Sequence, residues 1–448
     1  MEVFLTNAFL YIVWFAWCYK QKSEYSAFYL FSIGLYAVVS CMGAYVFDIG
    51  LYQEEIRDSR SLEYLSYLPY FLMFIMMMGV MSPLKVVPKF EIGWDAQRVS
   101  LFSKIFLFFM LGHLFFFLEG YQLGAASDLG DAYHMSVSGD LGQKYGSDIE
   151  MILSKVFRRL SICVMPIFLY LQFYRIVKNQ KSMMALFLLI VGFGATVTPS
   201  VLQGSRGSLF FNFFALVYIY TNFKDEIPVD IKKKIYGIAF AVLGLLGFYA
   251  IIISFARVDG DVDVALNRIM RYFGEPFLNL GLVYWDSTDI HTYGLRFFPK
   301  LLEWFGGFEL PDSKYGVDAV REFWSNVYRV NMYYFKTLFG DLYLEFGTIG
   351  AFVVALLTIA AGWLAKKISN PLLSHFLLYY YARVIVLWGI FGYGFLQDVF
   401  IDLSYAIVFW LLISKFWNPA KVEDGACDKK AESDAEKAET GETDEDDE

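Results

Sequence analysis

The chain has 448 residues, of which 57% are hydrophobic and 20% aromatic, and a formal net charge of −9. A composition this apolar excludes an ordinary soluble domain. The negative charge lies in the C-terminal tail, because residues 418–448 hold thirteen acids and four lysines. The rest of the chain is neutral, so it shows no basic surplus, and we expect no nucleic-acid partner.

Long apolar runs recur along the chain, and each is near the roughly 20 residues that a helix needs to cross a bilayer. Because a bilayer offers backbone groups no other partner, these runs are predicted to be helices. We expect an all-α polytopic membrane protein with about eleven transmembrane helices. The predicted spans are about 3–19, 27–47, 62–82, 99–118, 152–174, 182–201, 208–222, 235–256, 341–364, 373–395 and 399–416.

Basic residues alternate between successive connections. The connections after spans one, three, five, seven and nine hold fourteen, including Lys20, Lys85 and Lys232. The opposite short connections hold four. The positive-inside rule then places the N-terminus outside and the C-terminus in the cytoplasm.

The chain divides into four predicted parts. An N-terminal bundle of eight spans is followed by a large outer loop, three further spans and a disordered, solvated acidic tail. The respective ranges are 1–256, 257–336, 337–417 and 418–448.

The outer loop is too aromatic for a linker. Apolar residues recur at helical spacing, as at Val264, Ile269 and Phe273, and again from Phe297 onward. We expect short amphipathic helices across the outer mouth of the bundle. Such aromatic faces with nearby carboxylates suit sugar rings, although an interfacial aromatic belt explains the same residues.

Arginines gather at the predicted outer surface. Arg206 stands in the short connection 204–207, and Arg257 opens the large loop. Arg268 and Arg271 are three residues apart, which places them on one face of a helix. Guanidinium groups bind phosphate bidentately and keep their charge, so these residues indicate a site for a phosphate-bearing lipid. The alternative is that arginines at span ends reach to lipid headgroups.

Acidic residues at the start of span nine are candidate general bases. Asp341 and Glu345 are four residues apart and share a helix face. A carboxylate there could deprotonate a substrate hydroxyl. His291 is another candidate base, and without a second histidine nearby it is a poor metal ligand. Arg383, in the middle of span ten, is expected to pair with an acid such as Asp341, Glu345 or Asp398, or to contact the substrate.

The layout resembles Wzy-type O-antigen polymerases, which join oligosaccharide repeat units. The local matches are Gly204-Ser205-Arg206-Gly207, the arginine-rich start of the large loop, and GDLYLEFGTIGAF at residues 340–352. Arg296 and Gly307 also have the Arg-x10-Gly spacing of some members. The 119–150 loop holds no arginine, so the early motif of a two-motif scheme is missing.

The resemblance implies a fold similar to C-superfamily membrane glycosyltransferases, in the bacterial inner membrane, with a periplasmic large loop. A hydroxyl of one lipid-linked repeat unit would attack the anomeric carbon of a glycan on undecaprenyl diphosphate. The diphosphate contacts would be Arg206 and Arg257, helped by Arg268, Arg271 and Arg296. The residues that orient or deprotonate the acceptor would come from Glu275, His291, Asp341 and Glu345.

No cofactor or metal is expected, because the sequence offers no cysteine–histidine metal spacing and no nucleotide-sugar motif. The implied partners are undecaprenyl-diphosphate-linked glycans, membrane lipids, a chain-length regulator and other O-antigen assembly proteins. Two alternatives remain open. One is an O-antigen ligase, and the other is a lipid-linked oligosaccharide flippase or other transporter, which should show repeats and polar residues near mid-membrane.

Overall fold

The structure is a computed structural model. It describes residues 1–52, 65–87, 94–120, 147–202, 206–256, 262–285, 289–297, 316–391 and 404–411. Within these ranges the regular secondary structure is helical and no strand occurs. The predicted all-α class is confirmed for this part of the chain.

The helices follow the apolar runs of the sequence. Two π-helical turns, Leu280–Tyr284 and Arg383–Trp388, a short 3-10 helix, Ser82–Leu84, and a helical stretch at 404–411 accompany them. The α-helices are α1 (Glu2–Lys20), α2 (Ala27–Asp48), α4 (Leu68–Val80), α5 (Ala96–Gly120), α7 (Asp148–Val177), α8 (Ser182–Leu202), α9 (Arg206–Phe223), α10 (Val229–Ala256), α11 (Val262–Asn279), α13 (Gly316–Tyr328), α14 (Leu338–Lys366), α15 (Pro371–Ala382) and α16 (Gly389–Phe391).

Six helices in the described part are long and apolar enough to cross a membrane, namely α1, α2, α5, α7, α8 and α14. Two shorter apolar stretches cover Leu68–Leu84 and Pro371–Leu387. Large apolar side chains such as Phe9, Phe108 and Phe240 are exposed, as expected for surfaces that face lipid. The count of eleven spans stays a prediction, and most of the eleventh lies outside the described residues.

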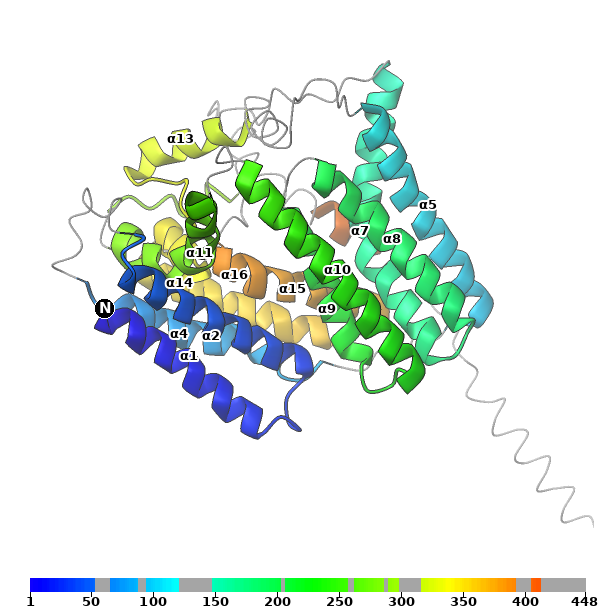
Figure 1. Cartoon of the computed structure of the whole chain (residues 1–448), viewed down its shortest axis with the longest axis horizontal. Coiled ribbons are helices and arrows are strands. Elements are labelled where there is room, and N and C mark those ends of the chain that lie inside the picture. The colour runs from blue at the N-terminus through cyan, green and yellow to red at the C-terminus, as the bar shows by residue number, and fades with distance from the viewer. Residues whose placement is uncertain are drawn as a thin grey trace, which may run out of the picture.

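The helices pack in two groups (Figure 1). Helices α5, α7 and α8 pack together, while α1 packs on α2 and α14 packs on α4 and α15. Helix α13 lies beyond one end of the second group. The core is rich in aromatic rings, including Tyr11, Tyr36 and Phe277, whose centroids are 5.7 to 6.1 Å apart.

Helix α11 packs deeply against α2. A Cβ on Gly274 would lie 2.8 Å from the carbonyl oxygen of Met42, so only glycine permits this approach. Residues 274–282 are all buried. The expectation of amphipathic helices is met at α11, but its second half packs inside the bundle rather than across its mouth. The rest of the predicted loop pattern, from 298 to 315, lies outside the described residues.

Candidate functional site

Helix α14 begins with a side-chain cap. The Thr337 Oγ1 accepts a hydrogen bond from the Gly340 amide at 3.1 Å. Such a cap satisfies one of the amides that the first turn leaves without an intrahelical partner. It starts the helix so that Asp341 and Glu345 share one face, and both side chains are fully buried.

A break in α14 docks the preceding loop onto the helix. Gly347 has φ 67° and ψ −177°, a conformation almost restricted to glycine. Carbonyls just before such a break lose their usual donors in the following turn. The Leu344 carbonyl lies 3.0 Å from His291 Nδ1, and the Glu345 carbonyl accepts from the Tyr293 amide at 2.7 Å. Loop 289–297 is thereby fixed against α14.

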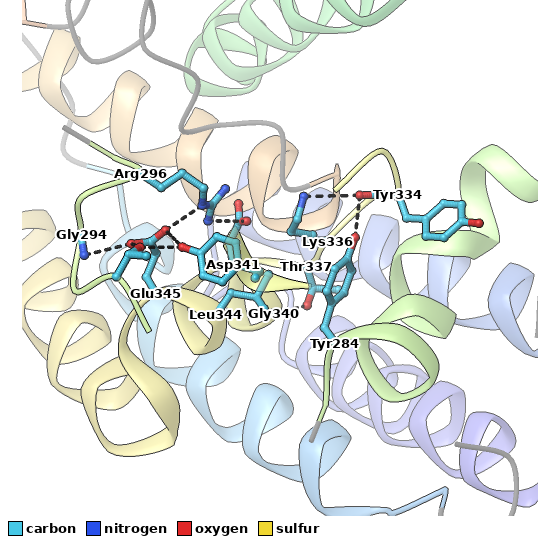
Figure 2. A network of polar contacts seen from close by, with 12 residues as sticks. Tyr284, Gly294, Arg296, Tyr334, Lys336, Thr337, Gly340, Asp341, Leu344 and Glu345 are labelled. Atoms are coloured by element: carbon cyan, nitrogen blue, oxygen red, sulfur yellow. Dashed lines mark hydrogen bonds and ion pairs between the residues drawn. The ribbon is translucent and has the colours of Figure 1, made fainter. Parts of the chain in front are cut away.

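The docked loop brings a buried guanidinium to the two carboxylates (Figure 2). Arg296 is 8% exposed, and its Nη2 donates to Asp341 Oδ1 at 2.9 Å. Its Nε donates to Glu345 Oε1 at 2.7 Å. One arginine therefore links both acids of the helix face, in the directional geometry that guanidinium groups offer to carboxylates.

Glu345 accepts hydrogen bonds on both oxygens. Besides Arg296, Oε1 accepts from the Tyr328 hydroxyl at 2.5 Å. Oε2 accepts from the Thr292 hydroxyl at 2.7 Å and from the Gly294 amide at 2.9 Å. A carboxylate that accepts four hydrogen bonds is held rigidly. Glu345 therefore organises the site, since both of its oxygens already accept hydrogen bonds.

Asp341 differs, because its second oxygen has no such partner. Oδ2 is buried and makes no hydrogen bond to any described residue. Close by, Lys336 is 4% exposed and forms no ion pair with the described part of the chain. Its Nζ lies 3.5 Å from the Tyr334 carbonyl and 5.4 Å from the Tyr284 ring centroid. Asp341 Oδ2 and Lys336 Nζ are thus two buried polar groups with unused hydrogen-bonding capacity.

The segment that carries Lys336 is held by buried side chains (Figure 2). The Tyr284 hydroxyl lies 3.1 Å from the Asn331 carbonyl and 2.9 Å from the Tyr334 carbonyl. Asn279 Nδ2 donates to the Phe335 carbonyl at 3.0 Å. Both tethers come from the buried end of α11 and the π-helical turn after it, so the bundle positions the site.

Burial and charge act on the ionisable groups in opposite directions. Burial lowers the pKa of Lys336 to about 7, since the pull of Asp341 is opposed by Arg296. Burial also lowers the pKa of Arg296, but the carboxylates of Asp341 and Glu345 outweigh it and leave this pKa above its ordinary value. Burial is the main cause that raises the pKa of Tyr328. Arg296 is therefore permanently charged, while Lys336 changes charge near neutral pH.

The structure gathers only some of the predicted site residues. Arg296, Asp341 and Glu345 form one cluster, and His291 contacts the same helix. Arg271 and Glu275 lie on α11, where the Arg271 guanidinium is 5.9 Å from the Tyr52 ring centroid. Three predicted arginines cannot be placed against the cluster, because Arg257 and the side chains of Arg206 and Arg268 lie outside the described residues.

Arg296 and Arg383 lie in surroundings that the sequence did not indicate. Arg296 was predicted to help bind diphosphate, but it is buried and its donors face two carboxylates. Of the acids predicted as partners of Arg383, Asp341 and Glu345 pair with Arg296, and Asp398 lies outside the described residues. The Arg383 guanidinium instead lies 4.7 Å from the Phe211 ring centroid.

Sequence reasoning missed Lys336, Tyr328 and Thr292. Lys336 stands one residue before the cap of α14 and five residues before Asp341, at the predicted outer end of a span. That position was a usable signal. Tyr328 and Thr292 lie 17 and 53 residues from Glu345, and no spacing rule connects them.

The arrangement can bind an anion or a hydroxyl and accept a proton. Lys336 offers N–H donors, and Asp341 Oδ2 offers an acceptor in a position shielded from water. In the described part of the chain, no group of three or more His, Cys, Asp or Glu side chains lies close enough together to hold a metal ion.

Comparison with known proteins finds no matching family model, curated protein or solved structure. The resemblance to Wzy-type polymerases stays an expectation, and the activity that it implies is a proposal.

Proposed function

We propose that this protein is a membrane glycosyltransferase of the Wzy type. It would polymerise undecaprenyl-diphosphate-linked repeat units into O-antigen, or a similar surface polysaccharide, at the periplasmic face of the bacterial inner membrane. The observation that carries the proposal is the buried cluster of Arg296, Asp341, Glu345 and Lys336 at the start of α14. Buried ionisable groups with shifted pKa values, such as Lys336, cluster at functional sites.

Asp341 is the proposed proton acceptor. Arg296 fixes Oδ1, and Oδ2 is left for the attacking hydroxyl of the acceptor sugar. The hydroxyl oxygen bonds to the anomeric carbon of the donor glycan as its proton moves to Asp341. The bond from that carbon to the diphosphate oxygen breaks, and its electron pair leaves with undecaprenyl diphosphate. Glu345 positions Arg296 throughout.

Cations stabilise the leaving diphosphate. Charge that develops on phosphate oxygens is lowered in energy by fixed donors in a site that excludes water. Lys336 supplies one buried donor. Arg206 and Arg257, with Arg268 and Arg271, are proposed as the others, on the strength of their sequence positions. The leaving group then departs as an anion and needs no proton.

The proposal is tested by deleting the gene in its host and examining the lipopolysaccharide on a gel. We expect a single repeat unit on the core and no ladder, because flipping and ligation continue without polymerisation. Loss of that first unit would favour the ligase or the flippase instead. An intact ladder, together with unchanged capsule and exopolysaccharide, would exclude the polymerase function.

A further inference from the structure

A cavity of about 340 Å³ lies at the opposite, lysine-rich end of the bundle. Its walls come from the connection before α2 and from the regions where α7 and α9 end. Lys22, Lys178 and Lys224 line it, one from each of these regions. The cavity shares no residue with the α14 cluster.

The three lysines are free to bind an anion. None forms an ion pair with any residue that the structure describes. Lys22 and Lys178 lie over tyrosine rings, 5.6 and 5.8 Å from the centroids of Tyr19 and Tyr174. A cation–π contact attracts each ammonium group to its ring and leaves the positive charge of the lysine in place.

The acids of the cavity set the charge of its occupant. Asp225 and Glu226 also line it, so among the described residues of its wall three positive charges accompany two negative ones. A surplus of one positive charge suits a singly charged phosphodiester better than a nucleotide with several charges. Tyr170 and Tyr174 also line the cavity, and each combines an apolar ring with a polar hydroxyl. Such side chains suit the glycerol end of a lipid at a membrane surface.

We propose that this cavity binds a singly charged phosphate group, best matched by the headgroup of an anionic phospholipid in the adjoining leaflet. Lys22, Lys178 and Lys224 contact the phosphate oxygens. The lipid chains leave along the bundle surface, where apolar side chains are exposed. The site joins the connections of α2, α7 and α9, so its occupant stabilises their packing.

The test compares three full-length proteins, purified and exposed to mixed micelles of phosphatidylglycerol and phosphatidylcholine. They are the wild type, the variant K22Q/K178Q/K224Q and the matched control K232Q/K233Q/K234Q. The control removes the same charge from the same end but leaves the cavity intact. Native mass spectrometry counts retained phosphatidylglycerol, and thermal unfolding without lipid confirms that all three fold.

Wild type and control should retain phosphatidylglycerol. The cavity variant should bind it at least about tenfold more weakly, since each lysine near an anionic membrane surface adds to the attraction. Stabilisation by inorganic phosphate alone, lost in the cavity variant, would assign the same site to a soluble phosphate. Equal lipid retention and equal phosphate response in all three proteins would overturn the proposal.

Discussion

Arg296 joins two buried carboxylates that would otherwise face each other across one helix turn. Removing charges from water costs free energy that the attraction within the pair only partly returns, so such a cluster is weak evidence of selection for stability. Its retention in the interior is better explained by function. The same energetics make the loss of one partner expensive, because the others remain buried and charged.

Arg296→Met should therefore destabilise the protein by about 3–5 kcal/mol. The comparison is Arg98→Met, which removes an exposed pair with Asp95 at 3.9 Å and should cost less than about 1 kcal/mol. Unfolding in detergent, followed by temperature or denaturant, measures both. Similar losses in the two variants would show that the buried cluster is not paired as described.

Lys336 gives the site a pH dependence. Its pKa of about 7 means that the ammonium is present below neutral pH and is lost as the pH rises through 7. If the ammonium holds the donor diphosphate, the KM for the donor should rise across this range. In Lys336→Arg the charge persists, and the rise should disappear. An identical profile in both proteins would remove Lys336 from donor binding.

At the scale of elements, the break in α14 positions the loop that carries Arg296. Gly347 interrupts the helix, and the two carbonyls before it bond to the loop that carries Arg296. A regular helix would leave that loop without its anchor. The positive φ of Gly347 is the feature that this break requires.

Gly347→Ala should lower stability by about 1–3 kcal/mol and abolish polymer formation. A Cβ there meets a strained φ and lies 3.1 Å from His291 Nε2. Gly244→Ala is the control, since a Cβ at that helical position meets nothing within 4 Å. It should be neutral or stabilise the protein by up to about 1 kcal/mol. Normal polymer in Gly347→Ala would contradict the anchoring role of the break.

Sequence periodicity predicted the elements far better than their partners. Apolar runs of span length located α1, α2, α5, α7, α8 and α14, because length and hydropathy are local properties. The spacing of Asp341 and Glu345 also predicted their shared face. It could not identify Arg296, 45 and 49 residues away, as their partner, since that contact depends on how the loop folds back. Nor does amphipathicity reveal that α11 enters the bundle.

At the scale of the whole molecule, the two ends of the bundle differ in character. The α14 cluster lies at the end where α14 begins, and the lysine-lined cavity lies where α7 and α9 end. In the predicted topology, which stays a prediction, the lysine-rich end is cytoplasmic. The proposed chemistry and the proposed lipid site would then occupy opposite membrane surfaces.

Cysteine labelling tests this orientation. In a variant whose four native cysteines are replaced by serine, Tyr293→Cys should react with an impermeant maleimide in spheroplasts, because Tyr293 is 74% exposed near the α14 cluster. Lys233→Cys, an exposed position at the other end, should react only after the membrane is opened. The reverse pattern would invert the topology and exclude a periplasmic site.

The most direct test of the proposed activity uses purified protein in vesicles with undecaprenyl-diphosphate-linked repeat units. The wild type should form a product of two units and release undecaprenyl diphosphate. Asp341→Asn keeps the shape of the side chain but removes the proton acceptor, and should reduce the rate by about a hundredfold or more. Lys233→Gln should leave it unchanged. A full rate in folded Asp341→Asn, or no two-unit product from the wild type, would contradict the account.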